Sequence, residues 1–201
     1  MISIIDYDAG NIRSVEKAFN YFGQEVTITR DPKTLLSSDK VILPGVGAFE
    51  DAMSMIRKYD LEPVIKDYVA TGKPFFGICL GLQLLFEGSD EGRGVEGLSI
   101  LKGGIHKIPD SPGLKSPHMG WNSLELMNNG RLFKGIQNQS YVYFVHSYYL
   151  KADDPQIVTA TTEYSTTIHA SVESGNVFAC QFHPEKSSDV GLQIIKNFID
   201  L

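Results

Sequence analysis

Residues 74–86 constrain the fold of this chain more strongly than any other stretch. An apolar run ends at Ile78, Cys79 follows with a glycine two residues away on either side, and leucines then recur at helical spacing. This order predicts a strand, a sharp elbow and a helix, with the cysteine at the elbow. Glycines suit the flanking positions because the elbow backbone is strained and a neighbouring Cβ would obstruct the turn.

Cys79 is the candidate nucleophile of this elbow. The following helix would point its N-terminal N–H groups and the positive end of its dipole at the sulfur, which favours the thiolate. The alternative interpretation is a buried cysteine packed between two glycines. The short motif fits both, whereas the predicted strand, turn and helix around it favour a nucleophile.

The N-terminal part of the chain alternates strands and helices. Apolar runs over 2–7, 26–28 and 40–43 predict buried strands before the elbow strand, and helical patterns begin at Ile12, Phe49 and Leu61. We expect Asn11 to cap the first helix. This alternation is typical of a parallel sheet with crossover helices.

The C-terminal part predicts hairpins and one closing helix. Short β-type runs lie at 100–108, 124–126, 141–144, 157–162, 167–171 and 177–181. Residues 190–198 form an amphipathic pattern, with Ser188 or Asp189 as the expected cap. Neither a repeat nor a linker interrupts the chain. We therefore expect residues 1–201 to form a single α/β domain, an open, mostly parallel sheet with flanking helices and added antiparallel hairpins.

Charge and cysteine content limit which classes of partner and which cellular compartment are expected for this chain. The formal charge is −6, the pI is near 5.3 and no basic cluster is present, which argues against nucleic acid or an anionic membrane as a partner. The spacing of Cys79 and Cys180 fits neither a disulfide framework nor a zinc site, so we expect a reducing compartment and neither a metal nor a cofactor. With no secretion signal and no run of membrane-spanning length, we expect a cytoplasmic protein.

His183 has the setting expected of a base for the cysteine. It follows an apolar run, so it lies at a strand end, where α/β sheets place their sites. Pro184 favours an extended residue before it, and Glu185, two residues on, would face the same side at a Cα separation of ~7 Å. Glu185 could then orient His183 toward a thiol, as in a Cys-His-carboxylate triad. The alternative is a loop histidine beside a solvated glutamate.

Acyl transfer also needs donors for an oxyanion. One candidate is the N–H of Leu80, and the other comes from the turn at 44–47, where Val46 and Gly47 follow a predicted strand. That turn could equally be an ordinary strand-to-helix connection. Gln83, on an otherwise apolar helix, needs a polar partner and could bind substrate or a neighbouring loop.

Taken together, the stretches 44–47, 77–83 and 183–185 resemble the class I (triad) glutamine amidotransferases. Further stretches resemble one branch of that family, the glutaminase subunits of imidazole glycerol phosphate synthase in histidine biosynthesis. These stretches are 6–15, 43–53, 117–122, 143–148 and 181–187. The match extends over nearly the whole chain and implies a flavodoxin-like sheet. Two positions depart from the pattern: Asp8, where a small residue is expected, and Ser165, where glycine is usual.

The resemblance implies a mechanism. Cys79 would attack the carboxamide of glutamine and form a thioester, His183 would carry protons and Glu185 would hold His183. Ammonia would pass to a (β/α)₈-barrel cyclase subunit, forming a heterodimer. The residues implied in glutamine binding are Gly47, Gln83, Val145, His146, Ser147 and Tyr148, and the candidates for the docking surface are Trp121, Tyr143 and Lys186.

The turn at 44–47 is the expected point of control. Glycines flank Val46, so the Gly45–Val46 peptide can flip, and we expect its N–H to be turned away at rest and turned in by the liganded partner. Three rival interpretations remain. They are a free-standing hydrolase with the same triad, a glutaminase serving another synthase, and a flavodoxin-like binding or scaffold protein with an inert thiol.

Overall fold

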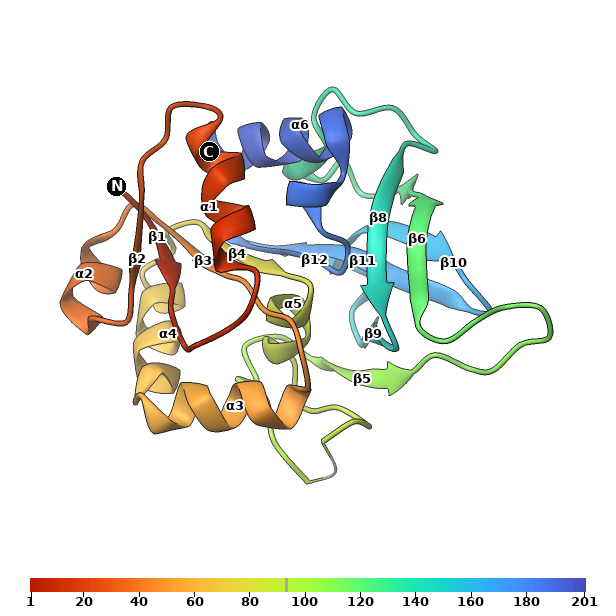
Figure 1. Ribbon diagram of the computed structural model, residues 1–201, viewed down its shortest axis with the longest axis horizontal. Helices are drawn as coiled ribbons and strands as arrows, with labels where there is room; N and C mark the ends of the chain where they lie inside the picture. The colour runs from red at the N-terminus through yellow and green to blue at the C-terminus, as the bar shows by residue number, and fades with distance from the viewer. Residues whose placement is uncertain (93) are drawn as a thin grey trace.

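The computed structural model describes residues 1–92 and 94–201 and is built on an eight-stranded sheet of order β2-β1-β3-β4-β12-β11-β10-β7 (Figure 1). The first five strands in this order run parallel, and the last three are antiparallel additions. Their bounds are β1 Ile2–Ile5, β2 Val26–Thr29, β3 Lys40–Leu43, β4 Phe75–Ile78, β7 Glu125–Leu126, β10 Val158–Glu163, β11 Thr167–Ser174 and β12 Val177–Cys180. The predicted fold class is confirmed.

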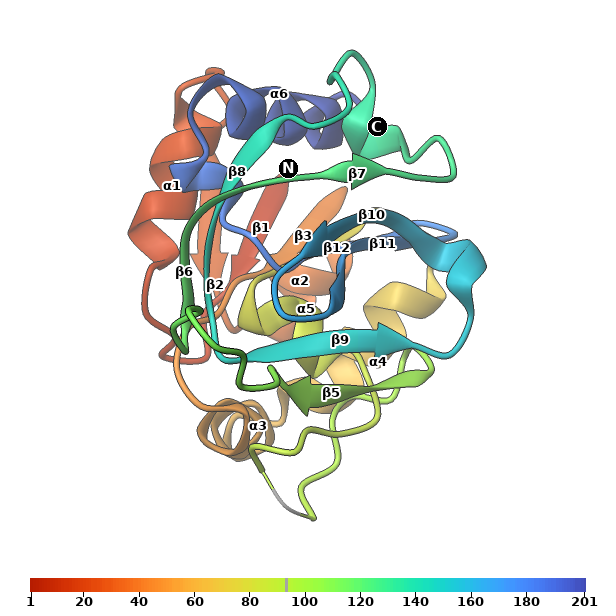
Figure 2. The ribbon, with the colours of Figure 1, turned by 90° about the vertical axis from the view of Figure 1, so that its right-hand side faces the viewer.

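Helices cover both faces of the sheet. On one face, α1 and α6 pack through Phe19 and Phe198 against one apolar core, and on the other face α3 and α4 pack through Met53 and Ile65 against a second core (Figure 2). The helix bounds are α1 Ile12–Asn20, α2 Pro32–Ser37, α3 Phe49–Lys58, α4 Leu61–Ala70, α5 Leu80–Leu84 and α6 Ser188–Ile199. The described residues also form three 3₁₀ turns, η1 Arg131–Phe133, η2 Pro155–Ile157 and η3 Pro184–Lys186. In the described part of the chain, no helix combines the length and apolar character that a membrane crossing requires.

Two pairs of strands lie outside the main sheet. β5 Gly103–Lys107 pairs with β9 Tyr148–Ala152, and β6 His118–Ser123 pairs with β8 Tyr141–His146. The predicted antiparallel additions are therefore present, some within the main sheet and some beside it, and Ser147 separates β8 from β9. This break has a consequence for the site: it leaves a bend whose backbone faces α5 (Figure 2).

Two helices, α2 and α6, differ from expectation. Residues 32–37 carry no helical apolar pattern, yet they form α2, because Asp31 accepts a hydrogen bond from the Thr34 N–H and Pro32 occupies the first turn. The expected cap of α6 is also wrong, because the helix begins at Ser188 and its cap position is Ser187. Ser187 instead uses its hydroxyl to bond the His183 carbonyl, which ties η3 to the start of α6.

The two departures from the family pattern share one backbone property. Asp8 has φ 64° and Ser165 has φ 55°, which is the left-handed region that glycine enters without strain. At Asp8 the carboxylate compensates with bonds to Tyr59 and Arg30. The side chain of Ser165 makes no hydrogen bond within the described residues.

Ser165→Gly is therefore expected to stabilise the fold, by about 0.5–1 kcal/mol. Glycine removes the strain of an L residue at positive φ, and its greater freedom in the unfolded chain offsets part of the gain. Urea denaturation measures the free energy of unfolding. Ser165→Ala, which keeps the strained Cβ, is the matched control and should give no stabilisation; equal values for the two variants would contradict the argument.

Candidate active site

Cys79 lies at a strained elbow between β4 and α5. Its backbone angles are φ 55° and ψ −110°, a conformation that L residues rarely adopt. The two glycines are required by close approaches: a Cβ at Gly81 would lie 1.9 Å from the Leu43 carbonyl oxygen, and one at Gly77 would lie 2.8 Å from the Gly81 oxygen. The elbow predicted from the sequence is present, and it presents the cysteine at the carboxyl end of a central strand.

His183 and Glu185 follow β12, the strand beside β4. His183 Nδ1 lies 2.7 Å from Glu185 Oε1, and the two side chains are 1% and 0% exposed. Because a carboxylate only accepts, Nδ1 carries a proton and donates it to Glu185, and Nε2 makes no hydrogen bond within the described residues. Burial lowers the pKa of His183, but Cys79 and Glu185 outweigh burial and raise it to about 9. The Glu185 carboxylate therefore orients the imidazole, and the nearby Cys79 sulfur makes the imidazole more basic.

Asn11 is a residue whose role the sequence reasoning missed. Its Nδ2 donates to Glu185 Oε1 at 2.6 Å, and its own backbone is left-handed, with φ 71°. The side chain makes no bond to α1, so the expected helix cap is wrong. Asn11 instead orients the carboxylate that orients His183. Helix-start patterns point only to nearby N–H groups, so they gave no signal for this distant partner.

The Leu80 N–H, one of the two expected oxyanion donors, is engaged by the chain itself. It donates to the Gly45 carbonyl oxygen at 3.3 Å. A trans peptide holds its C=O and N–H in opposite directions, so the Val46 N–H points away from Leu80. In this conformation the two expected donors do not converge. A flip of the Gly45–Val46 peptide would free the first donor and turn in the second.

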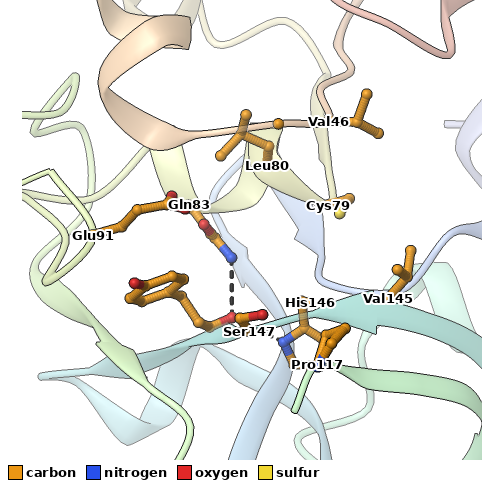
Figure 3. Close-up of a pocket in the computed structure, with 11 residues that line it drawn as sticks. Val46, Cys79, Leu80, Gln83, Glu91, Pro117, Val145, His146 and Ser147 are labelled. Atoms are coloured by element: carbon orange, nitrogen blue, oxygen red, sulfur yellow. Dashed lines mark hydrogen bonds between the residues drawn. The ribbon is translucent and has the colours of Figure 1, made fainter.

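A pocket of ≈ 280 Å³ lies beside the cysteine (Figure 3). Cys79, Leu80 and Val46 come from one side of it, and the end of β8 together with Ser147 forms the other side. The Gln83 side chain reaches across, donating to the Tyr148 carbonyl at 3.1 Å. The lining includes the expected residues Val46, Gly47, Cys79, Leu80, Gln83, Val145, His146, Ser147 and Tyr148, together with Glu91 and Pro117.

Glu91 lies in a stretch rich in glycine and acidic residues, a composition that indicates a loop and gives no local signal of a binding role. Its carboxylate accepts a hydrogen bond from the Phe49 N–H at the start of α3, at 2.8 Å. This bond holds the loop against the pocket. Glu91 thereby places a negative charge on a lining that contains no other carboxylate side chain among the described residues.

The three candidate interface residues lie near one another, outside the pocket. Trp121 on β6 is opposite Tyr143 on β8, with the two rings 6.1 Å apart at their centroids. Trp121 is 51% exposed, Tyr143 is half-buried, and Lys186 is exposed on η3, which packs against β8. Met119, two residues from Trp121, is also largely exposed. Met119 and Trp121 give the surface beside the site an apolar character, and Lys186 adds a positive charge to it.

Cys180 is fully buried and, unlike Cys79, does not line the pocket. Its Sγ lies 3.4 Å from the Phe182 carbonyl oxygen, and burial, followed by the charges on Glu185 and Cys79, raises its pKa well above the usual value. A thiol in this setting stays protonated. No group of three or more His, Cys, Asp or Glu side chains within 1–92 and 94–201 is arranged to hold a metal ion.

Acid is expected to destabilise the protein between about pH 6.5 and pH 5. Burial lowers the pKa of His118 to about 4 and that of His146 to about 3, and it also lowers the pKa of His169. Below pH 6.5 the unfolded chain therefore binds more protons than the folded one, so the free energy of unfolding falls by up to about 1.4 kcal/mol per pH unit for each histidine. Urea denaturation at pH 7, 6 and 5 measures this slope. His118→Gln should reduce the slope, and an unchanged slope would contradict the assignment.

Comparison with known proteins agrees with this geometry. The family model described as glutamine amidotransferase class-I matches residues 3–201. The chain is 52% identical over 198 residues to the imidazole glycerol phosphate synthase subunit HisH of Caldanaerobacter subterraneus subsp. tengcongensis, covering 98% of this chain and 97% of that protein. It is 48% identical over 200 residues to the same subunit of Moorella thermoacetica, covering 100% and 94%.

Solved structures show the same fold at lower identity. A crystal structure of a glutamine amidotransferase aligns with a TM-score of 0.77 at 19% identity, covering 99% of this chain and 97% of that chain. The structure of PurLQS from Thermotoga maritima contains a chain that aligns with a TM-score of 0.76 at 22% identity, with coverage of 99% and 97%. The family match extends from the first strand to the last helix, so the chain belongs to the class I glutamine amidotransferase family.

Proposed function

We propose that this chain is the glutaminase subunit of imidazole glycerol phosphate synthase in histidine biosynthesis. It hydrolyses glutamine to glutamate and ammonia and delivers the ammonia to a cyclase subunit. The observation that carries the chemistry is the elbow cysteine beside a buried histidine that is held by a carboxylate. The choice of synthase is supported by the identity of about half of the residues to HisH subunits along the whole chain.

In the proposed reaction, the Cys79 thiol passes its proton to His183 Nε2, as the raised pKa of that imidazole favours, and the sulfur then attacks the carboxamide carbon of glutamine. The tetrahedral intermediate collapses when His183 returns that proton to the leaving nitrogen, which releases ammonia and leaves a γ-glutamyl thioester. His183 then takes a proton from water, which attacks the thioester carbon. The sulfur leaves as a thiolate and is reprotonated by His183, and glutamate is released. Glu185 and Asn11 keep the imidazole oriented throughout.

The pocket supports recognition of the amino-acid end of glutamine. The Glu91 carboxylate would pair with the α-ammonium group, because opposite charges attract strongly at a partly buried site. Gly47, Gln83 and the segment at 145–148 would supply polar contacts to the remaining groups, with the carboxamide directed at Cys79. This arrangement places the reacting carbon next to the sulfur and within reach of both proposed oxyanion donors, Leu80 and Val46, once the peptide has flipped.

We propose the surface formed by Met119, Trp121, Tyr143 and Lys186 as the docking site for a (β/α)₈-barrel cyclase. Exposed aromatic and Met side chains are enriched at protein interfaces, and Lys186 would pair with an acidic residue of the partner. Chemistry on such barrels takes place at the carboxyl ends of the strands. A glutaminase docked at the opposite end would therefore deliver ammonia along the barrel axis.

Transfer of labelled nitrogen tests the proposed function. The chain is purified together with the cyclase subunit and supplied with the cyclase's nucleotide substrate and glutamine carrying ¹⁵N in its amide. We expect a one-to-one complex and ¹⁵N in the imidazole ring of the product. Hydrolysis of glutamine without a complex and without labelled product would instead indicate a free-standing hydrolase.

A further inference from the structure

Gln181 is a buried amide that the mechanism above does not use. It follows β12 directly, is fully buried, and lies two residues before His183. Its Oε1 accepts a hydrogen bond from Gln83 Nε2 at 2.9 Å, and its own Nε2 lies 3.8 Å from Cys79 Sγ. A polar side chain at such a position is costly unless its atoms have partners, and here one of those partners is the sulfur of the proposed nucleophile.

The neighbouring bonds determine which end of this amide faces the sulfur. A carbonyl oxygen can only accept, so Tyr148 O requires the NH₂ end of Gln83. That NH₂ group has a second hydrogen, which it donates to Gln181. Gln181 must therefore present its oxygen to Gln83, and its own NH₂ group is left facing Cys79. Turning either amide over would place two acceptors or two donors against each other.

The same logic extends to two buried histidines. His146 Nδ1 lies 2.8 Å from Tyr148 O, so it carries a proton, and its Nε2 is an acceptor 3.0 Å from His118 Nδ1. His118 in turn presents Nε2 to the Asn122 amide at 3.3 Å. Each bond in this series has one allowed direction when both imidazoles are neutral. The bonds from Asn122 on β6 meet those from Gln83 at the Tyr148 carbonyl, which accepts from both His146 and Gln83, so the β6–β8 pair helps to hold the acceptor that orients Gln83 and, through it, Gln181.

We infer that Gln181 is a further catalytic residue, whose side-chain N–H stabilises negative charge on the Cys79 sulfur. Sulfur carries that charge twice: when the thiol gives its proton to His183, and when the thiolate is expelled from the thioester. Gln181 has no basic atom, so it takes no proton in either step. Gln83, His146 and His118 act through it and are positioning residues. This inference rests on the proposed glutaminase chemistry.

The test replaces Gln181 by methionine, which has a similar length and no N–H donor. A hydrogen bond to a charged atom is strong enough that its loss should slow alkylation of Cys79 by iodoacetamide at pH 7 by about 10- to 100-fold. In the complex with the cyclase, kcat for glutamine should fall by a similar factor while KM changes by less than about 3-fold. Co-elution of the variant with the cyclase at a one-to-one ratio shows that it folds and assembles, and synthesis from added ammonium salts, which needs only the cyclase, should continue at the wild-type rate.

Two further variants keep the outcome decisive. Gln193→Met on the exposed side of α6 is the matched control, and its alkylation rate and kcat should equal those of the wild type. Gln83→Met leaves Gln181 in place but removes the amide that orients it, and should slow alkylation in the same direction if Gln181→Met does not assemble. Wild-type alkylation rates in both Gln181→Met and Gln83→Met would overturn the inference. Alkylation needs neither glutamine nor the cyclase, so this result is distinguishable from failure of the proposed function.

Discussion

Cys79→Ala is expected to abolish glutamine hydrolysis while leaving synthesis from added ammonium salts intact. Removing the nucleophile of a triad typically costs at least ~10⁴-fold, because acyl transfer can no longer proceed through a covalent intermediate. The cyclase reaction needs only ammonia, so supplying it externally bypasses the lost step. The measurement compares product formation by the purified complex with glutamine and with ammonium salts as the nitrogen source.

The second cysteine is the internal control. Cys180→Ala should retain glutamine-dependent synthesis, because Cys180 is fully buried and its raised pKa keeps it protonated. A glutamine-like electrophile should accordingly label Cys79 alone. Mass spectrometry that located the adducts mainly on Cys180 would refute the assignment of the nucleophile. So would a Cys79→Ala complex that still hydrolysed glutamine.

Glutamine turnover is also expected to rise by at least ~10²-fold when the cyclase and its nucleotide substrate bind. In the structure the Gly45 carbonyl accepts the Leu80 N–H, so one oxyanion donor is engaged and the Val46 N–H points away. The loss of one such donor typically costs ~10²–10³ in rate. A partner that stabilises the flipped Gly45–Val46 peptide would therefore recover a factor of this size. Initial rates of glutamate release with and without the liganded partner give the ratio.

Val46→Pro tests whether this peptide is the point of control. Proline lacks an N–H, so the variant should lose ~10² or more in stimulated turnover and should no longer respond to the cyclase ligand. Val46→Ala keeps the N–H and is the matched control, which should still be stimulated. Proline also restricts Gly45, so the comparison counts only once Val46→Pro has been shown to bind the cyclase. An assembled Val46→Pro complex that is stimulated as strongly as the wild type would place the control elsewhere.

The sequence predicted those parts of the fold that depend on local apolar patterns. The strands of the parallel half are short buried runs, and the helical pattern that begins at Leu61 starts where α4 Leu61–Ala70 starts. β6 was missed because half-exposed strands carrying His118 and Asn122 lack the clear alternation that identifies a strand. Helix α2 was missed because it is short and depends on the Asp31 cap rather than on an apolar face.

The candidate site also contains residues that local motifs identify and residues whose contacts the sequence does not predict. Cys79, His183 and Glu185 were proposed from short motifs, and the structure brings all three motifs to adjacent strand ends. The contacts of Asn11 and Gln181 were not predicted, because their partners lie 174 and 102 residues away. A polar residue whose partner is distant in sequence produces no local pattern. Such contacts can be identified only once the fold has brought the two distant residues together.

The position of β12 has a consequence for synthesis of the protein on the ribosome. This strand is among the last elements of the chain, yet it lies between β4 and β11 and joins the parallel and antiparallel parts of the sheet. It also carries His183 and Glu185 to Cys79, whose elbow is translated about a hundred residues earlier. A nascent chain that has not yet reached Val177 therefore contains the thiol without its base. We therefore expect glutamine hydrolysis only from chains that have been translated through Glu185.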